Sequence, residues 1–364
     1  MKYGILIIGS TGQLGSKLLK YLAKENISVD TITCYKNEKK ILNQKKKFKV
    51  KSSYILSDFN QKNDFILKLK TKKFSIIYFL DYGSSSLIYL ENILKKNSKS
   101  IIAIANKEMI IAGGHFLRKA IKNSKNLLVP LDSEHFSIYR LNPINSEIHK
   151  LFITASGGPF YFKKNKDLNN VNKKEVLSHP KWKMGPNNTI DSSNFVNKIL
   201  EIFELSIIYN IDINKIDFLI SREAYVHSVL ISNDYTVHIT CFDNDMLIPM
   251  LKPITMCFKV KKLKLNSKKY LSTNNFKLDV FNDKRFKIIK HFKRLKELNH
   301  YQQISFMLLN NYAHSKYLNN KLVYSNIIDY ILTNIESDDN NVKFNSFNDI
   351  LRYIKMLKEK YEYI

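Results

Sequence analysis

Several residue types that mark particular classes of protein are scarce in this chain. Its 364 residues include three cysteines, seven prolines, ten glycines and one tryptophan. The cysteines (Cys34, Cys241 and Cys257) are odd in number and scattered, so they form neither a disulfide framework nor a zinc-binding or redox motif. They are most simply explained as buried thiols in a reducing compartment. The sequence also lacks any apolar run of the length that crosses a bilayer, which argues against a membrane-spanning role.

The start and the composition of the chain indicate a globular, cytoplasmic protein. Residues 3–8 already have the pattern of a buried strand, and no signal or transit segment is recognisable before them. Hydrophobic residues make up 44% of the chain and aromatic residues 12%, which argues against a disordered protein. A chain of 364 residues is long enough for two or three domains.

Acidic residues are few relative to basic ones. Lys and Arg number 59 against 32 Asp and Glu, which gives a net charge of +27. Such a charge can indicate a nucleic-acid-binding protein. The excess, however, is spread along the chain, is mostly Lys and accompanies abundant Asn, Ile, Tyr and Phe. This pattern favours drift of the coding sequence toward A and T, and a selected polyanion-binding face is the alternative. We therefore expect no nucleic-acid partner.

Three of the few glycines are evenly spaced near the start of the chain. Gly9, Gly12 and Gly15 lie between a buried-strand pattern and an amphipathic helix pattern. Glycines at such a turn let the backbone approach a pyrophosphate at the helix N-terminus. The spacing is not Gly-x-Gly-x-x-Gly, and an ordinary strand-to-helix turn would give the same pattern. The next strand ends at Lys36 and Asn37, where NAD-binding proteins carry a carboxylate, so NADP is favoured over NAD.

Strand and helix patterns alternate through the first 131 residues. Buried-strand patterns recur at residues 54–56, 75–80, 100–105 and 127–131. The alternation predicts an α/β fold with a doubly wound parallel sheet, in which ligands bind beyond the carboxyl ends of the strands. Two polar clusters follow successive strands: Asn106-Lys107-Glu108 and Asp132-Ser133-Glu134-His135. Loop solvation is the ordinary explanation for one such cluster and a less satisfactory one for two.

Asp132 and Glu134 are separated by one residue. If the strand continues through them, both side chains point to the same side, and adjacent carboxylates repel unless a cation or proton lies between them. With Glu201 as a third oxygen ligand, the set would suit a hard divalent ion such as Mg²⁺ or Mn²⁺. No Cys/His pattern supports zinc. The alternative is a pair of solvated or helix-capping acids.

Residues 178–201 combine an apolar helix pattern with polar residues. Asp191 and Ser192 have the character of a helix N-cap, and the pattern after them is apolar on most of its circumference. Three polar residues nevertheless fall on one side of that helix: Asn197, Lys198 and Glu201. They form either a solvated stripe or the polar face of a site. In the second case the preceding loop would cover the site with His179, Trp182 and Met184.

The remaining segments carry weaker signals. Ser156, Gly157 and Gly158 end another strand pattern and can form an anion-binding nest, although an ordinary turn is equally compatible. Strand patterns return between residues 218 and 250 and indicate a second domain or a dimer contact. The chain then reads as a polar linker, and the pattern is helical from residue 284 to the end.

Six of these segments, taken together in order and spacing, resemble the 1-deoxy-D-xylulose 5-phosphate reductoisomerase family over nearly the whole chain. They are GSTGQLG (9–15), ANKE (105–108), PLDSEH (130–135), TASGGPF (154–160), HPKWKMG (179–185) and IDSSNFVNKILE (190–201). The resemblance implies an N-terminal Rossmann-like NADPH-binding domain (1–131) and a central α+β catalytic and dimerisation domain (132–265). It also implies a C-terminal helical domain (284–364), and the polar composition of residues 266–283 predicts a linker before that domain.

The same resemblance implies an activity and its cofactors. The expected reaction is metal-dependent rearrangement and NADPH reduction of 1-deoxy-D-xylulose 5-phosphate to 2-C-methyl-D-erythritol 4-phosphate. This reaction belongs to the methylerythritol phosphate pathway of isoprenoid precursor biosynthesis. The expected cofactors are NADPH and Mn²⁺ or Mg²⁺, and the expected assembly is a homodimer without a nucleic-acid or membrane partner.

Matching positions imply the residue roles. The implied NADPH contacts are Thr11, Gly12, Gln13, Leu14, Lys36, Asn37, Asn106, Glu108 and Gly185. The implied metal ligands are Asp132, Glu134 and Glu201. The carbon backbone of the substrate would meet Lys107, Ser133 and Glu134, and its phosphate would meet Ser156, His179, Ser192, Asn197 and Lys198. Trp182 and Met184 would belong to a closing lid.

Some positions depart from the family pattern. Ile199 stands where the family usually has Gly, Tyr35 replaces a small residue beside the 2′-phosphate site, and residues 221–224 differ as well. None of these is an implied metal or phosphate ligand. Two competing hypotheses are a degenerate relative that binds NADPH without turnover and a basic nucleic-acid-binding protein.

Overall fold

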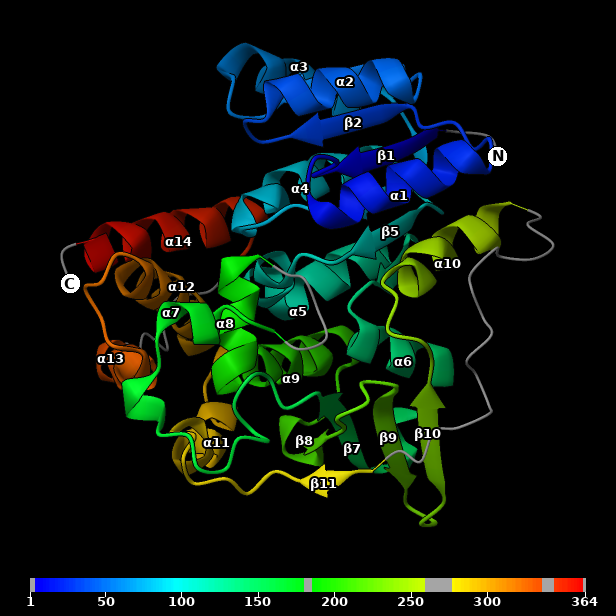
Figure 1. Ribbon diagram of the computed structural model, residues 1–364. Coiled ribbons are helices and arrows are strands. Elements are labelled where there is room, and N and C mark those ends of the chain that lie inside the picture. Colours follow the sequence, from blue (N-terminus) through cyan, green and yellow to red (C-terminus); the bar gives the residue numbers. More distant parts are fainter. Residues whose placement is uncertain (1–3, 180–184, 259–276, 336–343, 363–364) are drawn as a thin grey trace. The chain divides into compact units, whose positions relative to one another are not determined.

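The computed structural model describes residues 4–179, 185–258, 277–335 and 344–362 (Figure 1). These residues form two compact units, one from residues 4–139 with 245–258 and the other from residues 140–244 with 277–362. Within these described ranges, no helix combines the length and the apolar character that a membrane span requires.

The first unit is built on a six-stranded parallel sheet, so the predicted α/β fold with a doubly wound parallel sheet is confirmed. The strand order is β3-β2-β1-β4-β5-β6, which places a ligand crevice at the carboxyl ends of β1 and β4, where the order reverses. The strands are β1 (Gly4–Ile8), β2 (Thr31–Cys34), β3 (Ser52–Ile55), β4 (Phe74–Phe79), β5 (Ile101–Ile104) and β6 (Leu127–Pro130). The helices are α1 (Gln13–Lys24), α2 (Glu38–Lys47), α3 (Phe59–Thr71), η1 (Ser84–Ser86), α4 (Leu87–Lys96), α5 (Lys107–Asn123), α6 (Ser133–Leu141) and α10 (Leu247–Cys257).

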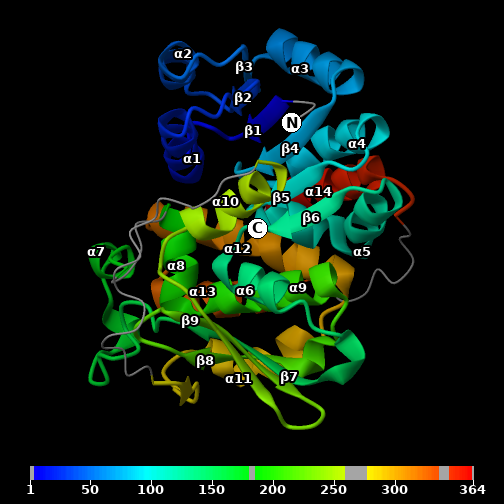
Figure 2. The same ribbon diagram turned by 90° about the vertical axis from the view of Figure 1, so that its right-hand side faces the viewer.

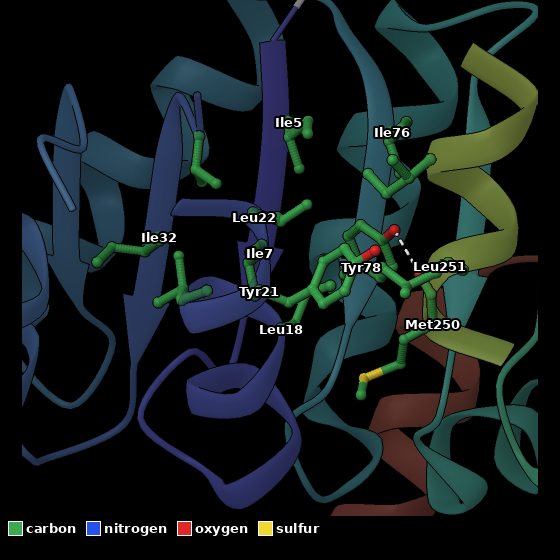
Figure 3. Packing of buried hydrophobic residues seen from close by; sticks show 14 of the residues in the cluster. Ile5, Ile7, Leu18, Tyr21, Leu22, Ile32, Ile76, Tyr78, Met250 and Leu251 are labelled. Carbon is green, nitrogen blue, oxygen red and sulfur yellow. Dashed lines mark hydrogen bonds between the residues drawn. The ribbon is translucent and has the colours of Figure 1, made fainter. Parts of the chain in front are cut away.

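The core of this unit includes a helix from far along the chain. Ile5, Ile76 and Tyr78 on the central strands are fully buried, and Met250 and Leu251 of α10 join the same apolar cluster (Figure 3). The Tyr78 hydroxyl donates a 2.8 Å hydrogen bond to the carbonyl of Met250. Because a buried hydroxyl without a partner is costly, this bond favours one position of α10 on the sheet.

The second unit contains a mixed five-stranded sheet in the order β10-β9-β7-β8-β11. β7 (Ile148–Ala155) is parallel to β8 (Ile216–Ile220), and the other pairs are antiparallel: β9 (Val226–Ser232), β10 (Val237–Cys241) and β11 (Asp279–Val280). The helix α9 (Val196–Tyr209) packs beside β8 (Figure 2). The other helices are η2 (Asn145–Glu147), η3 (Leu168–Asn170), α7 (Lys173–Val176), α8 (Pro186–Asn194), η4 (Ile213–Lys215), α11 (Ile288–Lys296), α12 (His300–Leu318), η5 (Tyr324–Asn326), α13 (Ile327–Asn334) and α14 (Phe347–Glu362).

Two segments differ from what the sequence predicts. The strand pattern predicted up to residue 250 ends at Cys241, and residues 247–257 form the helix α10 of the first unit. The predicted linker (266–283) includes β11, which pairs with β8. The two compact units therefore do not coincide with the three predicted domains. The division into three domains stays a prediction.

Candidate functional site

The glycine turn at the end of β1 is tightly packed. Gly9 has φ +86°, and a Cβ there would lie 2.6 Å from the backbone nitrogen of Asp81. A Cβ at Gly15 would lie 2.6 Å from the carbonyl oxygen of Gly9. Gly12 is the N-cap of α1 and has no side-chain capping bond, so the first amides of this helix are available to an anion. Two of the predicted NADPH contacts, Thr11 and Gly12, lie on this turn, and two more, Gln13 and Leu14, begin α1.

The end of β2 presents cations beside the same turn. Lys36 is exposed, and its Nζ lies 5.3 Å from the ring centroid of Tyr35. The side chain of Asn37 accepts a 3.1 Å hydrogen bond from the amide of Lys40 and so caps α2. Lys40 Nζ donates a 2.6 Å hydrogen bond to the carbonyl of Thr11. Lys40 was missed from the sequence because it lies one helical turn beyond the expected position.

Asn106 fixes the beginning of α5. Its Oδ1 accepts a 2.9 Å bond from the amide of Met109, and its Nδ2 donates to the Gly83 carbonyl at 2.9 Å and to Asp81 Oδ1 at 3.3 Å. Desolvation raises the pKa of Asp81 to about 6, against the opposing hydrogen bonds from Ser86 and Asn106. Asn106 therefore holds the first turn of α5, which carries Lys107 and Glu108, and Asp81 is a polar group that the sequence patterns did not single out.

Asp132 and Glu134 do not lie on one strand, which corrects the geometry expected from the sequence. β6 ends at Pro130, and Asp132 caps α6, because its Oδ1 accepts from the amide of Glu134 at 3.2 Å and its carbonyl accepts from that of Phe136 at 2.8 Å. The turn after Pro130 starts a helix because this capping acid precedes it. Glu134 then projects from the first helical turn.

The carboxylate of Asp132 also has a lysine and a histidine as neighbours. Lys107 Nζ donates to its Oδ2 at 2.8 Å, and His135 Nδ1 lies 3.1 Å from its Oδ1. Ser133 Oγ donates to Glu134 Oε2 at 2.5 Å. The first unit thus brings together all four of the residues predicted there for substrate and metal: Lys107, Asp132, Ser133 and Glu134.

The predicted helix N-cap at Asp191 and Ser192 is wrong. Both residues lie in the last turns of α8, which begins at Pro186 after the N-cap Gly185. Phe195 then adopts the left-handed conformation with φ 67°, and α9 begins at Val196, whose amide is bonded to Asn194 Oδ1 at 3.0 Å. The helix predicted as continuous is therefore two helices.

The polar side of α9 is buried. Glu201 is 1% exposed and accepts from Lys198 Nζ at 2.5 Å and from Asn197 Nδ2. Lys198 is 6% exposed. The interpretation of these residues as a solvated stripe is therefore wrong. A buried ion pair in a mostly apolar helix is costly to retain for stability alone.

A second group of predicted residues surrounds the Gly-Gly turn after β7. Ser156 Oγ lies 3.4 Å from His179 Nε2. Burial, together with the positive charge of Lys198, lowers the pKa of His179 to about 4, so the imidazole is neutral at pH 7. Gly158 has φ +58°, and a Cβ there would lie 2.6 Å from the carbonyl oxygen of Ser192. The two segments predicted to bind phosphate are therefore packed backbone to backbone.

The predicted site residues are divided between the two units. The first unit holds Asp132, Glu134 and most of the predicted cofactor contacts, whereas the second holds Glu201, Gly185 and the predicted phosphate contacts. Trp182 and Met184, the predicted lid residues, lie outside the described residues.

Comparison with known proteins decides the family. Residues 128–209 match the model of the 1-deoxy-D-xylulose 5-phosphate reductoisomerase C-terminal domain. The 1-deoxy-D-xylulose 5-phosphate reductoisomerase of Pelagibacter ubique is 33% identical over 348 residues, covering 89% of this chain and 88% of the relative. The chain belongs to this reductoisomerase family. That of Clostridium novyi is 28% identical and covers 90% of both chains.

Solved reductoisomerase structures share the fold. The enzyme from Zymomonas mobilis in complex with NADPH aligns with a TM-score of 0.82 at 19% identity, over 99% of this chain and 98% of that one. A reductoisomerase in complex with NADPH, fosmidomycin and magnesium aligns with a TM-score of 0.85 at 21% identity, over 98% and 96%. The reductoisomerase fold thus extends over almost the whole chain.

Proposed function

We propose that this chain converts 1-deoxy-D-xylulose 5-phosphate to 2-C-methyl-D-erythritol 4-phosphate with NADPH and a divalent metal ion. The observation that carries the proposal is the buried pair of Lys198 and Glu201 on α9, to which the half-buried Asn197 is bonded. An ion pair buried in a mostly apolar helix has a natural explanation if its polar groups face substrate and metal. In a chain with the family's motifs in order, that explanation is the reductoisomerase reaction.

The residues fit a hard divalent ion. Asp132, Glu134 and Glu201 are all carboxylates, the ligand type that Mg²⁺ and Mn²⁺ prefer. We propose that these three residues hold the ion. A bound ion of this kind supplies Lewis-acid polarisation of substrate oxygens. We propose that Lys107, which is bonded to Asp132 Oδ2, also meets an oxygen of the substrate backbone, and that Ser133 orients the Glu134 carboxylate.

The residues also fit NADPH. The turn at Gly9 to Gly15 leaves no room for a Cβ at either end, and the N-terminus of α1 offers uncapped amides to the pyrophosphate. Lys36 and Asn37 would contact the 2′-phosphate, and Lys40 adds a further cation at the same place. The nicotinamide supplies the hydride, and the protein supplies its placement. Asn106, Glu108 and Gly185 are the proposed contacts further along the cofactor.

The substrate phosphate would lie among Ser156, His179, Ser192, Asn197 and Lys198. Lys198 supplies a positive charge, and the neutral imidazole of His179 can donate one hydrogen bond. These contacts are remote from the reacting carbons, so their binding energy can be used to orient the substrate and exclude water. Trp182 and Met184 are proposed to close over it.

We also propose that the protein acts as a homodimer in the cytoplasm. β10 pairs with β9 along one side, and its residues Val237 and Ile239 are 56% and 41% exposed. Apolar side chains exposed on a strand at the edge of a sheet support a contact with a second copy. Thiols at Cys34, Cys241 and Cys257, which form no disulfide, are consistent with a reducing compartment.

The test is an assay of NADPH oxidation with purified protein, 1-deoxy-D-xylulose 5-phosphate and Mg²⁺ or Mn²⁺. The proposal predicts oxidation that requires both the sugar phosphate and the metal. No oxidation with either metal, combined with normal NADPH binding, would favour the degenerate relative. Salt-sensitive DNA binding at physiological ionic strength, in place of turnover, would favour the nucleic-acid-binding alternative.

A further inference from the structure

A buried carboxylate lies directly beside the proposed phosphate contact Ser192. Asp191, on α8, is 5% exposed, and its Oδ1 accepts a 2.7 Å hydrogen bond from Asn310 Nδ2. His314 Nε2 lies 3.1 Å from the same oxygen. Asn310 and His314 are one turn apart on α12 and are 1% and 0% exposed. α12 thus supplies both partners of this carboxylate.

This cluster is unusual in its chemistry. Burial of a carboxylate is unfavourable unless nearby groups compensate it, and apolar residues of similar volume usually stabilise a core better. The arrangement does, however, restrain α8 against α12, because the Asn310 amide donates to the Asp191 carboxylate in a directional hydrogen bond and the His314 imidazole packs against the same oxygen. Such a restraint acts directly on the backbone of the next residue, Ser192.

Two further contacts restrain the backbone around Ser192. Ser193 Oγ lies 3.0 Å from the hydroxyl of Tyr324 in η5, so the residues before and after Ser192 are both bonded to the C-terminal helices. The carbonyl of Ser192 also packs against Gly158, where a Cβ would lie 2.6 Å from the Ser192 carbonyl oxygen. Ser192 therefore lies between the Gly-Gly turn and a polar anchor on α12.

We propose that Asn310 and His314 are positioning residues, which hold Asp191 so that the hydroxyl of the next residue, Ser192, is placed to donate to the substrate phosphate. The inference rests on the proposed function and assigns the C-terminal helices a part in substrate binding. Neither residue touches the substrate. Both act through Asp191, so their effect depends on the presence of the Ser192 hydroxyl.

Steady-state kinetics in two backgrounds test this dependence. Asn310→Leu removes the hydrogen bond to Asp191, and His314→Leu removes the imidazole 3.1 Å from the same oxygen. Each is expected to raise the KM for 1-deoxy-D-xylulose 5-phosphate about tenfold, the scale of one contact to a carboxylate. The KM for NADPH is expected to stay unchanged. In a Ser192→Ala background, the same substitutions should raise the sugar-phosphate KM by less than about twofold, because the positioned hydroxyl is already absent.

Three controls separate positioning from stability. His314→Gln retains a donor, so its KM should lie much closer to the wild-type value than that of His314→Leu. Asn311→Leu makes the same chemical change as Asn310→Leu one residue along α12 and should leave the KM unchanged. If Asn310→Leu does not fold, Asp191→Asn, which keeps the volume, replaces it in the same cycle, with thermal unfolding recorded for every variant.

Equal effects in the wild-type and Ser192→Ala backgrounds would overturn the inference, as would an unchanged KM in well-folded Asn310→Leu and His314→Leu. Either result leaves the proposed function intact, because the wild type still turns over. Absence of turnover in the wild type would instead refute the proposed function itself.

Discussion

Replacement of Glu201 by Gln separates metal binding from cofactor binding. The Glu201 carboxylate is almost fully buried and accepts from both Lys198 and Asn197. Gln has a similar volume but only one acceptor oxygen, so its NH₂ group, itself a donor, would face one of these two donors. The Lys198 ammonium then lacks its compensating charge. Removal of one partner of a buried ion pair costs about 3–5 kcal/mol, so we expect the melting temperature to fall by several degrees.

The effect on ligands should be uneven. Loss of a proposed metal ligand should lower Mn²⁺ affinity by at least about 100-fold, the upper end for a residue that only supports a ligand. Turnover should be lost with it. NADPH affinity should stay within about twofold, because the glycine turn and the first turn of α1 belong to the other unit. Calorimetry with Mn²⁺ and fluorescence titration with NADPH measure the two affinities on the same preparation.

Asp217→Asn is the matched control. Asp217 is also an acid of the second unit that pairs with a lysine, Lys150, at 3.5 Å, but it lies on β8 and is not a proposed ligand. It should leave Mn²⁺ affinity and turnover unchanged. Unchanged Mn²⁺ affinity in Glu201→Gln would refute the assignment of this residue, and joint loss of Mn²⁺ and NADPH binding would mean that its effect is on folding.

Three further predictions concern other parts of the chain. Gly158→Ala places a Cβ 2.6 Å from the Ser192 carbonyl at a residue with φ +58°, so stability should fall by about 1–3 kcal/mol and the sugar-phosphate KM should rise; a wild-type KM would contradict the close packing. The pKa of Asp81 in the folded protein is raised from 3.8 to about 6, so its contribution to stability is present at low pH and is lost as pH rises through about 6. The loss is at most about 3 kcal/mol. Asp81→Asn should remove this pH dependence of the unfolding free energy, measured with urea, and an unaltered pH profile would exclude the raised pKa. Val237→Lys on β10 should shift the protein from dimer to monomer in light scattering, and a wild-type mass would place the dimer contact elsewhere.

The strands of the first unit were predictable because their signal is local. Ile5 to Ile8 and Ile101 to Ile104 are fully buried runs bounded by turn residues, which a parallel sheet covered on both faces requires. The pattern of α10 was misleading. Its apolar residues include Pro249 and Pro253, and the sequence gives no sign that Met250 bonds to Tyr78, 172 residues away.

The site was predictable in its residue types and less so in its geometry. The order of the motifs singled out Asp132, but the expectation of a continuing strand failed because Asp132 itself caps a helix. Asp191 resembles an N-cap in the sequence, since an Asp just before an apolar helix pattern usually caps that helix. In the structure it is buried instead, because Asn310 and His314 supply partners from more than 100 residues along the chain. Partners at that distance leave no local pattern.

The most direct test of the proposed reaction is product stoichiometry. Purified protein is incubated with NADPH, Mg²⁺ and 1-deoxy-D-xylulose 5-phosphate, and NADPH consumption is compared with the 2-C-methyl-D-erythritol 4-phosphate detected by mass spectrometry. We predict one product molecule for each NADPH oxidised. After a chelator removes the metal, we predict neither NADPH oxidation nor product formation. NADPH consumption without this product, or no consumption at all by folded protein that binds NADPH, would contradict the proposal.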